Sequence, residues 1–145
     1  MFTEMEVILQ PRFTLEEMLP QLALIQQLTP QITAEQYQRY LQSMIPNHYA
    51  QLVALCNGEV AGVSGYWLCT KLYCGPYLEI DNFVVDSQYR RAGIGSKMVQ
   101  WLEAEARKHE CQHMMLDAYL ENHLAHNFYK REGFTPRGYH FLKSL

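Results

Sequence analysis

Blocks of apolar and polar positions predict strands and helices in a defined order along the chain. Residues 2–9, FTEMEVIL, are typical of a strand. Thr14 then precedes an apolar run, with Glu17 three residues later, which predicts a helix that begins with a capping box. Because proline lacks an N–H group and clashes with the preceding turn, Pro20 is expected to break or kink this helix.

A second helix is predicted after Thr33, since Gln36 stands three residues further on and completes the same capping pattern. Its apolar positions recur at helical spacing and are Tyr37, Tyr40, Leu41 and Met44. Farther along, Asn57-Gly58 separates two apolar runs. This dipeptide favours a tight β-hairpin because both residues readily adopt positive φ.

The second half of the chain alternates strands and helices. YLEIDNFVV predicts a strand, and a helix is predicted over 94–108, with an apolar stripe made of Ile94, Met98, Leu102 and Ala106. The remaining expectations are a strand within 112–120, a helix within 122–132 that Gly133 stops, and one or two closing strands within 134–145. Such an order of hairpins and crossovers predicts an α+β or α/β layered fold around a mixed sheet.

Composition and charge exclude several classes of protein. The 145-residue chain has the length of one domain and a net charge of −3, whereas nucleic-acid-binding domains usually carry a clear basic excess. No apolar run approaches the roughly 18 residues of a membrane span. The opening MFTEMEV carries acids where a secretion signal would carry lysines. We therefore expect a cytoplasmic protein with no nucleic-acid partner and no membrane partner.

Cysteines and histidines raise the question of a metal site. The four cysteines form no CxxC pair, so free thiols, buried or half-buried, are expected. His123 and His126 are one helical turn apart and could share a metal ion. His109 and His113 flank Cys111. No further ligand follows at a recognisable spacing, so these histidines are interpreted as surface or packing residues and no metal is expected.

A glycine-bearing turn precedes the helix predicted over 94–108. The first N–H groups of a helix lack partners and carry partial positive charge, so they attract phosphate. Gly93 and Gly95 would let a pyrophosphate reach the backbone. Arg90 and Arg91 would add positive charge, although an ordinary loop with solvated arginines has the same composition. The turn fits neither a P-loop nor a dinucleotide fingerprint, whose third glycine is replaced by a methionine.

The turn is one part of a longer pattern. Residues 90–95, RRAGIG, fit the motif Q/R-x-x-G-x-G/A. Residues 121–134, ENHLAHNFYKREGF, carry Asn122, Ala125, Phe128, Tyr129, Gly133 and Phe134. In this order the two segments resemble the GNAT superfamily, the Gcn5-related N-acetyltransferases. The resemblance implies a single domain over 1–145 with an α+β fold in α/β/α layers, in which a mixed, mostly antiparallel sheet of about six or seven strands is flanked by about four helices.

The resemblance also implies acetyl-CoA as the acetyl donor. Backbone amides from 91 to 96 would bind its pyrophosphate, while Arg90 fixes or assists the turn. The strand before the turn would part from its neighbour and pair with the pantetheine arm through Phe83 and Val85, and the amide near Val85 would polarise the thioester carbonyl. A plain core strand is the alternative for these positions. The implied cofactor-binding residues are Phe83, Val84, Val85, Arg90, Arg91, Ala92, Gly93, Ile94, Gly95, Ser96, Asn122 and Tyr129.

Attack of an amine on a thioester needs a proton acceptor and a proton donor. The resemblance implies that Tyr129 protonates the departing thiolate, and a tyrosine packed in the core is the alternative. Glu79 is the candidate general base, although an ordered water could serve instead. An exposed acid at the end of a strand is the alternative for Glu79. Alternation along the strand would place Glu79, Asp81, Phe83 and Val85 on one face unless a bulge intervenes. Glu79 and Asp81 are therefore also the candidate substrate-binding residues, with Asp81 orienting a cationic amine.

The sequence does not define the acceptor amine. Acids on the strand suit a cation, and the compact chain lacks an added peptide-docking segment, so a small amine such as an amino acid or polyamine is expected. The alternatives are a protein lysine or N-terminal acetyltransferase, a non-catalytic acyl-CoA-binding module, and a nucleotide-dependent enzyme, which the turn fits poorly. Asn122 would contact the cofactor, cap its helix, or both. The apolar end YHFLKSL is compatible with a homodimer and equally with a strand that completes its own sheet.

Overall fold

The computed structural model describes residues 6–90 and 92–145. Within them, five strands form one sheet whose spatial order follows the chain. The strands are β1 Val7–Arg12, β2 Tyr49–Cys56, β3 Glu59–Lys71, β4 Gly75–Val85 and β5 His113–Leu116. The first four pair antiparallel, whereas β5 pairs parallel with β4. The sheet is therefore mixed and mostly antiparallel, as the sequence predicts.

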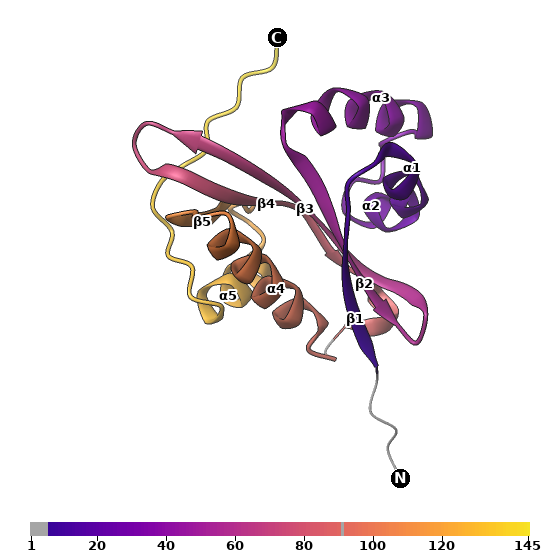
Figure 1. The fold of residues 1–145 in the computed structure, drawn as a ribbon. Coiled ribbons are helices and arrows are strands. Elements are labelled where there is room, and N and C mark those ends of the chain that lie inside the picture. Colours follow the sequence, from indigo (N-terminus) through magenta and orange to yellow (C-terminus); the bar gives the residue numbers. More distant parts are fainter. Residues whose placement is uncertain (1–5, 91) are drawn as a thin grey trace.

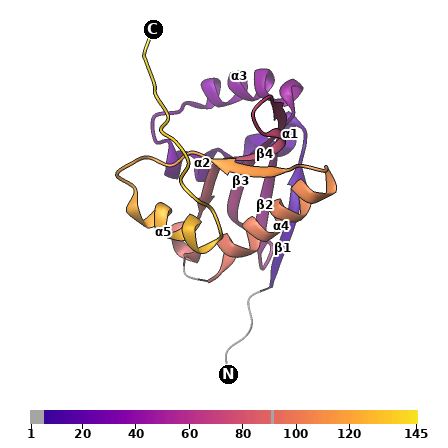
Figure 2. The same cartoon turned by 90° about the vertical axis from the view of Figure 1, so that its left-hand side faces the viewer.

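Helices cover both faces of the sheet (Figure 1). On one face lie α1 (Leu15–Met18), α2 (Leu22–Leu28) and α3 (Ala34–Met44), and on the other lie α4 (Ile94–Lys108) and α5 (His123–Arg131). The view in Figure 2 keeps the sheet between these two layers. The α/β/α layering is thus confirmed. Short 3-10 helices at Leu19–Gln21, Ile45–Asn47 and Ser87–Tyr89 complete the described helical elements.

Each layer packs on its own hydrophobic core. The core under α4 joins that helix to the sheet through Leu52, Tyr66, Leu78, Ile94, Met98 and Leu102, all at most 1% exposed. The core under α1, α2 and α3 is formed by Met18, Ile25, Tyr37, Leu41, Tyr49, Val53, Val63 and Val84. Because both faces of the central strands are buried, β2 is apolar at almost every position instead of alternating.

Several local predictions are confirmed by the backbone. Both capping boxes form, at Thr14 and at Thr33. The segment around Pro20 becomes a 3-10 turn that separates α1 from α2. Asn57 and Gly58 have φ of 51° and 86°, which is the conformation of a tight hairpin turn between β2 and β3.

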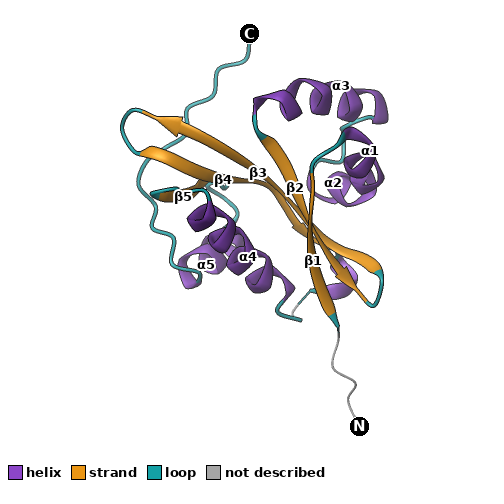
Figure 3. Ribbon diagram, viewed as in Figure 1, coloured by secondary structure: helices purple, strands orange, loops and turns teal. Residues whose placement is uncertain are grey.

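The C-terminal segment differs from the expectation. Residues 134–145 form no strand and run as a loop past β5 (Figure 3), so the described sheet has five strands instead of six or seven. Pro136 lacks an N–H group for a ladder, and the apolar residues beyond it pack on no described strand: Tyr139 is 75% exposed and Phe141 is 90% exposed. Alternation alone gives a strand only where a neighbour can pair with it.

Two further predictions need adjustment. The first strand runs over Val7–Arg12 instead of 2–9, and the predicted part before Glu6 lies outside the described residues. Tyr40 was assigned to the apolar stripe of its helix but is 46% exposed. The guanidinium of Arg39 lies 5.4 Å from the centre of its ring, which explains how a tyrosine is accommodated at this exposed position.

Candidate functional site

The turn before α4 leaves the start of that helix without a side-chain cap. Thr14, Thr33 and Asn122 cap α1, α3 and α5 with side-chain oxygens. Gly93 occupies the corresponding position of α4 with φ of 77° and offers no such oxygen, and the first turn of α4 carries no acid. The first N–H groups of α4 are therefore available to an anion, which is what the sequence predicts for this turn.

Gly95 lies where α4 meets α5. A methyl group at this position would come within 3.2 Å of Phe128 Cζ, so the glycine permits close packing of the two helices. Ser96 Oγ hydrogen-bonds Glu132 at the end of α5 and fixes the same junction. Ile94 is 1% exposed and belongs to the core under α4, so its side chain anchors the turn.

Arg90 and Ala92 are exposed on the turn. Arg90 Nε donates a long hydrogen bond of 3.4 Å to the carbonyl of Val85, which connects the turn to the end of β4. Arg91, for which cofactor contacts were also predicted, lies outside the described residues.

A β-bulge interrupts β4 just before its end. The pairing of β3 with β4 shifts by one position between Val63 and Gly65. Two residues of β4, Asn82 and Phe83, therefore face the single residue Ser64. Asn82 has φ of 52°, in the left-handed region that asparagine tolerates better than most residues.

The bulge places the candidate residues of β4 on two faces. Phe83 and Val85 pack against the core under α4. Asp81 lies on the opposite face, where its Oδ2 accepts a 3.0 Å hydrogen bond from Trp67 Nε1, and Trp67 packs against the core under α1, α2 and α3. Glu79, two residues before Asp81, shares that face. The expectation that all four residues share one face is therefore wrong, because the additional residue of the bulge shifts the alternation by one.

Just before the bulge, β4 parts from β5. The parallel pairing ends at Ile80 with Leu116, whereas β4 continues to Val85. The N–H of Asp86 donates to Ala61 of β3 at 2.8 Å. Because backbone groups alternate along a strand, those of Val85 and Phe83 then point away from β3, towards the side that β5 leaves unpaired. These are the backbone groups expected to meet the pantetheine arm.

Tyr129 stands on the α5 side of this opening. Its ring packs against Phe83, Phe128 and Phe134, with ring centres 6.0, 5.2 and 5.8 Å away. No other described residue hydrogen-bonds its hydroxyl. Burial raises the pKa of Tyr129 to about 12, so the phenol carries its proton at neutral pH.

Carboxylates gather on the other side. Burial, followed by the negative charge of Asp117, raises the pKa of Glu79 above its ordinary value of 4.5. Asp117 directly follows β5, and its Oδ2 lies 3.4 Å from His140 Nδ1 in the C-terminal segment. Lys71 and, to a lesser extent, His140 oppose the rise in the pKa of Glu79. The opening between β4 and β5 thus has a proton donor on one face and acids on the other.

Similarity to known proteins bears on this arrangement. The model of the acetyltransferase (GNAT) family matches residues 15–134. This chain belongs to the GNAT family.

Individual relatives are similar over part of their length. The aminoalkylphosphonate N-acetyltransferase of Salmonella typhimurium is 35% identical over 101 residues, which cover 69% of this chain and 65% of that protein. The aminoglycoside N(6′)-acetyltransferase type 1 of Acinetobacter baumannii is 32% identical over 72 residues, or 48% of this chain and 49% of that protein. The GNAT chain therefore matches about half to two-thirds of the length of these curated relatives.

Solved structures share the whole fold. An aminoglycoside N-acetyltransferase in complex with CoA superposes with a TM-score of 0.84 at 15% identity, covering 99% of the GNAT chain and 97% of that chain. An aminoglycoside 6′-N-acetyltransferase from Acinetobacter baumannii gives 0.80 at 22% identity, with coverage of 97% and 99%. At these identities the likeness establishes the fold.

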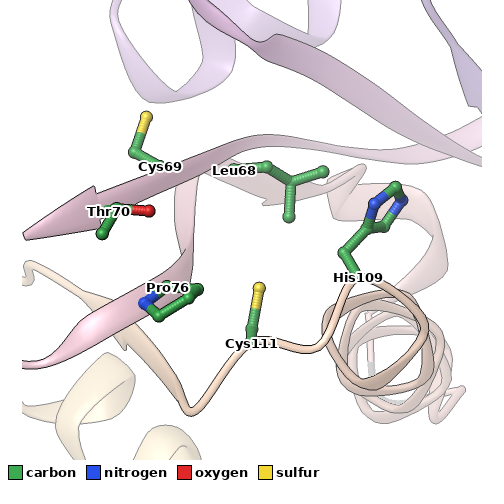
Figure 4. Close-up of a pocket in the computed structure, with 6 residues that line it drawn as sticks. All are labelled: Leu68, Cys69, Thr70, Pro76, His109 and Cys111. Atoms are coloured by element: carbon green, nitrogen blue, oxygen red, sulfur yellow. The ribbon is translucent and has the colours of Figure 1, made fainter.

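A hollow of about 190 Å³ lies elsewhere in this GNAT domain, lined by Leu68, Cys69, Thr70, Pro76, His109 and Cys111. Figure 4 shows the Cys111 sulfur pointing into it, while Cys69 points to the other side of its strand. The hollow lies beyond the C-terminal end of α4, about 22 Å along the helix from the glycine turn at 1.5 Å per residue. It is therefore separate from the glycine turn.

The cysteines and histidines fit structural roles. Cys56 is buried and Cys69, Cys74 and Cys111 are half-buried, all as free thiols, as predicted. Within residues 6–90 and 92–145, no three metal-ligating side chains come together. Nε2 of His126 lies 2.8 Å from the carbonyl oxygen of Tyr119 and is within hydrogen-bonding distance of it. One member of the His123 and His126 pair therefore already has a partner. None of the helices described is long and apolar enough to cross a membrane.

Sequence reasoning missed the contributions of Tyr49 on β2, which bonds Asn82 of the bulge, and of Trp67 on β3, which bonds Asp81 just before it. A signal for the bulge itself was present. Asp81 and Asn82 are both poor strand formers, and they interrupt an apolar run in the middle of a predicted strand. Such a pair is typical of a local break in the ladder.

Proposed function

We propose that this GNAT domain is an acetyl-CoA-dependent N-acetyltransferase that acetylates a primary amine of a small molecule by direct attack in a ternary complex. The observation that carries this proposal is the opening of the sheet where β4 leaves β5. This opening lies beside the start of α4, which has no side-chain cap. Carboxyl groups that could accept a proton lie on one face of β4, and the Tyr129 phenol, which could donate one, lies on the other.

The described residues fit CoA. The N–H groups at the start of α4 suit the pyrophosphate, because phosphate binds well at helix N-termini. The outward backbone groups of Phe83 and Val85 suit the amides of pantetheine, and the amide near Val85 would polarise the thioester carbonyl. Oδ1 of Asn122 caps α5 by accepting a hydrogen bond from the N–H of Ala125. The side-chain NH₂ group of Asn122 remains to contact the cofactor. Acetyl-CoA supplies the activated acetyl thioester.

The two faces of β4 would then divide the proton transfers. A cationic amine approaches from the face of Glu79 and Asp81, where Glu79 accepts a proton directly or through water. The raised pKa of Glu79 makes its carboxylate a stronger base than an exposed glutamate. Tyr129, on the opposite face, protonates the departing sulfur. A phenol with a pKa of about 12 remains protonated until that charge develops.

A small cationic acceptor is supported by the acids and by the relatives. Asp81 and Asp117 add negative charge beside Glu79, which attracts a protonated amine. Two relatives are named for aminoalkylphosphonates and aminoglycosides, which are small amines. We extend this class, and no individual compound, to the present chain.

The proposal includes a homodimer. Phe141, Leu142 and Leu145 in the C-terminal segment are 90%, 86% and 116% exposed, which is unusual for three apolar side chains so close in the sequence. A second copy of this chain would cover them. Sedimentation of wild type and of a variant with all three changed to serine tests this: both sedimenting as monomers would exclude the dimer.

The first experiment on function compares melting temperatures with acetyl-CoA, CoA, ATP and NADH. A ligand at 100 times its dissociation constant adds about 2.7 kcal/mol to the free energy of unfolding, so a shift of a few degrees is expected with both CoA species alone. Release of free CoA thiol with a panel of amines then tests transfer. A shift with ATP or NADH but none with CoA would overturn the proposal.

A further inference from the structure

A buried chain of polar side chains connects the helices above the sheet with the bulge of β4. Gln51 on β2 is fully buried, and its Nε2 donates to the hydroxyl oxygens of Tyr37 and Tyr49 at 3.1 and 3.2 Å. Tyr37 donates in turn to the carbonyl of Met18 in α1 at 2.8 Å. Tyr49 donates to Oδ1 of Asn82 at 3.1 Å. One glutamine thus joins a helix to the bulge through two tyrosines.

The bulge is held at Asn82 and at Asp81, the residue just before it. The backbone N–H of Asn82 donates to Asp81 Oδ1 at 2.9 Å, while Asp81 Oδ2 accepts from Trp67. The side chain of Asn82 accepts from Tyr49. The rings of Tyr49 and Trp67 pack with centres 4.9 Å apart, so the two donors also hold each other.

The position of Tyr49 is itself closely fixed. It is 4% exposed, and its hydroxyl and ring edge lie directly over Gly65. Any side chain at Gly65 would come closer than 3.0 Å to three Tyr49 atoms, so the glycine makes room for this phenol. Buried polar groups are costly unless they are hydrogen-bonded, and those that are bonded specify a geometry. The hydroxyls of Tyr37 and Tyr49 are both bonded, whereas Oε1 of Gln51 has no partner among the described residues. If Gln51, Tyr37 and Tyr49 served core packing alone, apolar residues would suffice at these positions.

The bulge is where that geometry matters to the reaction. The left-handed conformation of Asn82 turns the backbone so that the N–H and C=O groups of Phe83 and Val85 face the opening, while their side chains pack under α4. Resting on the function proposed above, we propose that Tyr49 and Asn82 are positioning residues: their hydrogen bond holds the bulge so that the backbone beyond it orients the acetyl thioester for attack. They act through the backbone and contact neither reactant.

Tyr37 provides a matched control for Tyr49. Each phenol accepts one hydrogen bond from Gln51 and donates one, to Met18 or to Asn82, and both are buried. Tyr49→Phe and Tyr37→Phe therefore remove the same number of hydrogen bonds. Only Tyr49→Phe frees the bulge.

The test measures kcat, KM and melting temperature for both variants. Similar losses of melting temperature are expected. Tyr49→Phe should lower kcat roughly 10- to 100-fold, as expected for misplaced reactants, while the dissociation constant of CoA stays unchanged, since the turn before α4 is intact. Tyr37→Phe should keep kcat within about twofold of wild type. Equal kcat in the two variants would show that the network only stabilises the fold.

Asn82→Gly supplies a second route to the same answer. Glycine keeps the left-handed backbone but removes the acceptor of Tyr49. It should lower kcat as Tyr49→Phe does, and the double variant should be no slower than either single one, because both remove one interaction. Independent, multiplying effects would contradict the proposal.

Binding measurements keep this inference separable from the proposed function. Calorimetry should show that Tyr49→Phe weakens acetyl-CoA relative to CoA, whereas Tyr37→Phe leaves the ratio of the two dissociation constants unchanged. A wild type that binds CoA but acetylates no amine would overturn the proposed function, and the ratio would still decide the role of Tyr49. An unchanged ratio in both variants overturns the positioning role alone. A wild type that binds neither CoA species overturns both.

Discussion

Asp81 and Phe83 stand two positions apart on β4, yet their side chains face opposite layers of the molecule. Asp81 accepts a hydrogen bond from Trp67 on the face of the sheet that α1, α2 and α3 cover. Phe83 packs beneath α4 and beside Tyr129. In a regular strand they would share a face. One additional residue therefore brings groups from both layers to the same opening in the sheet.

The first prediction concerns Tyr129, the proposed proton donor. Tyr129→Phe keeps the ring contacts with Phe83, Phe128 and Phe134, so melting temperature and CoA affinity should change little. Loss of the phenolic proton should lower kcat by roughly 10²- to 10⁴-fold. Steady-state kinetics beside a thermal melt measures both quantities. An unchanged kcat would show that Tyr129 is not the proton donor. If the protein were instead a module that only binds acyl-CoA, Tyr129→Phe would leave its function, which is binding, intact.

The second prediction concerns the glycine turn. Gly93→Ala places a side chain on a left-handed residue with φ of 77°, and apart from its chain neighbours no described residue lies within 4 Å of the new methyl group. The cost is therefore conformational, about 1–2 kcal/mol, and adjustment of the turn should weaken CoA binding. Gly58→Ala in the hairpin has φ of 86° and equally open surroundings. It should lose similar stability without any change in CoA affinity, and equal affinity losses in both would show that the turn is not the site.

The third prediction concerns pH. Because burial raises the pKa of Glu79, the folded state binds this proton more tightly than the unfolded chain does. Between the ordinary value of 4.5 and the raised pKa, this residue should make the free energy of unfolding fall as pH rises. Activity should rise over the same interval, since the ionised carboxylate is the proposed base.

Glu79→Gln should remove both trends at once. Paired profiles of kcat/KM and of melting temperature against pH provide the measurement. Repeating the rate profile with an amine of different pKa separates ionisation of the substrate from that of the enzyme. A rate profile unchanged in Glu79→Gln would assign the proton transfer to water.

The fourth prediction concerns the neighbour of Asp81. Trp67→Phe keeps an aromatic ring against Tyr49 but removes the donor to the Asp81 carboxylate. A freed carboxylate should orient the amine less well, so KM for the amine should rise severalfold while KM for acetyl-CoA stays constant. Equal changes in both constants would point to a general loss of structure.

The sequence predicts those parts of the fold that depend on local chemistry. The caps at Thr14 and Thr33, the hairpin at Asn57 and the limits of α4 all follow from neighbouring residues. The closing strands were wrong because pairing needs a partner strand, which a pattern within one segment does not reveal.

The candidate site divides in the same way. The turn around Gly93 is visible in the sequence because its conformation and its phosphate chemistry reside in adjacent residues. The sequence does not show that the side chains of Glu79 and Phe83 lie on opposite faces of the sheet, because this depends on a shift in register between β3 and β4. The network through Gln51 joins residues far apart in the chain, and no spacing rule connects them.

The agreement between strand order and chain order has a consequence for how the molecule opens. The hairpins β2–β3 and β3–β4 make contacts of short sequence separation, which form early and cooperatively. The pairing of β4 with β5 must wait for the α4 crossover, and α5 contains no fully buried residue. Native-state hydrogen exchange should therefore be slowest in β2 and β3 and fastest in β5, α5 and the segment after them. Bound CoA would slow exchange chiefly in this last-assembled region, so the ligand would complete the half of the protein that folds last.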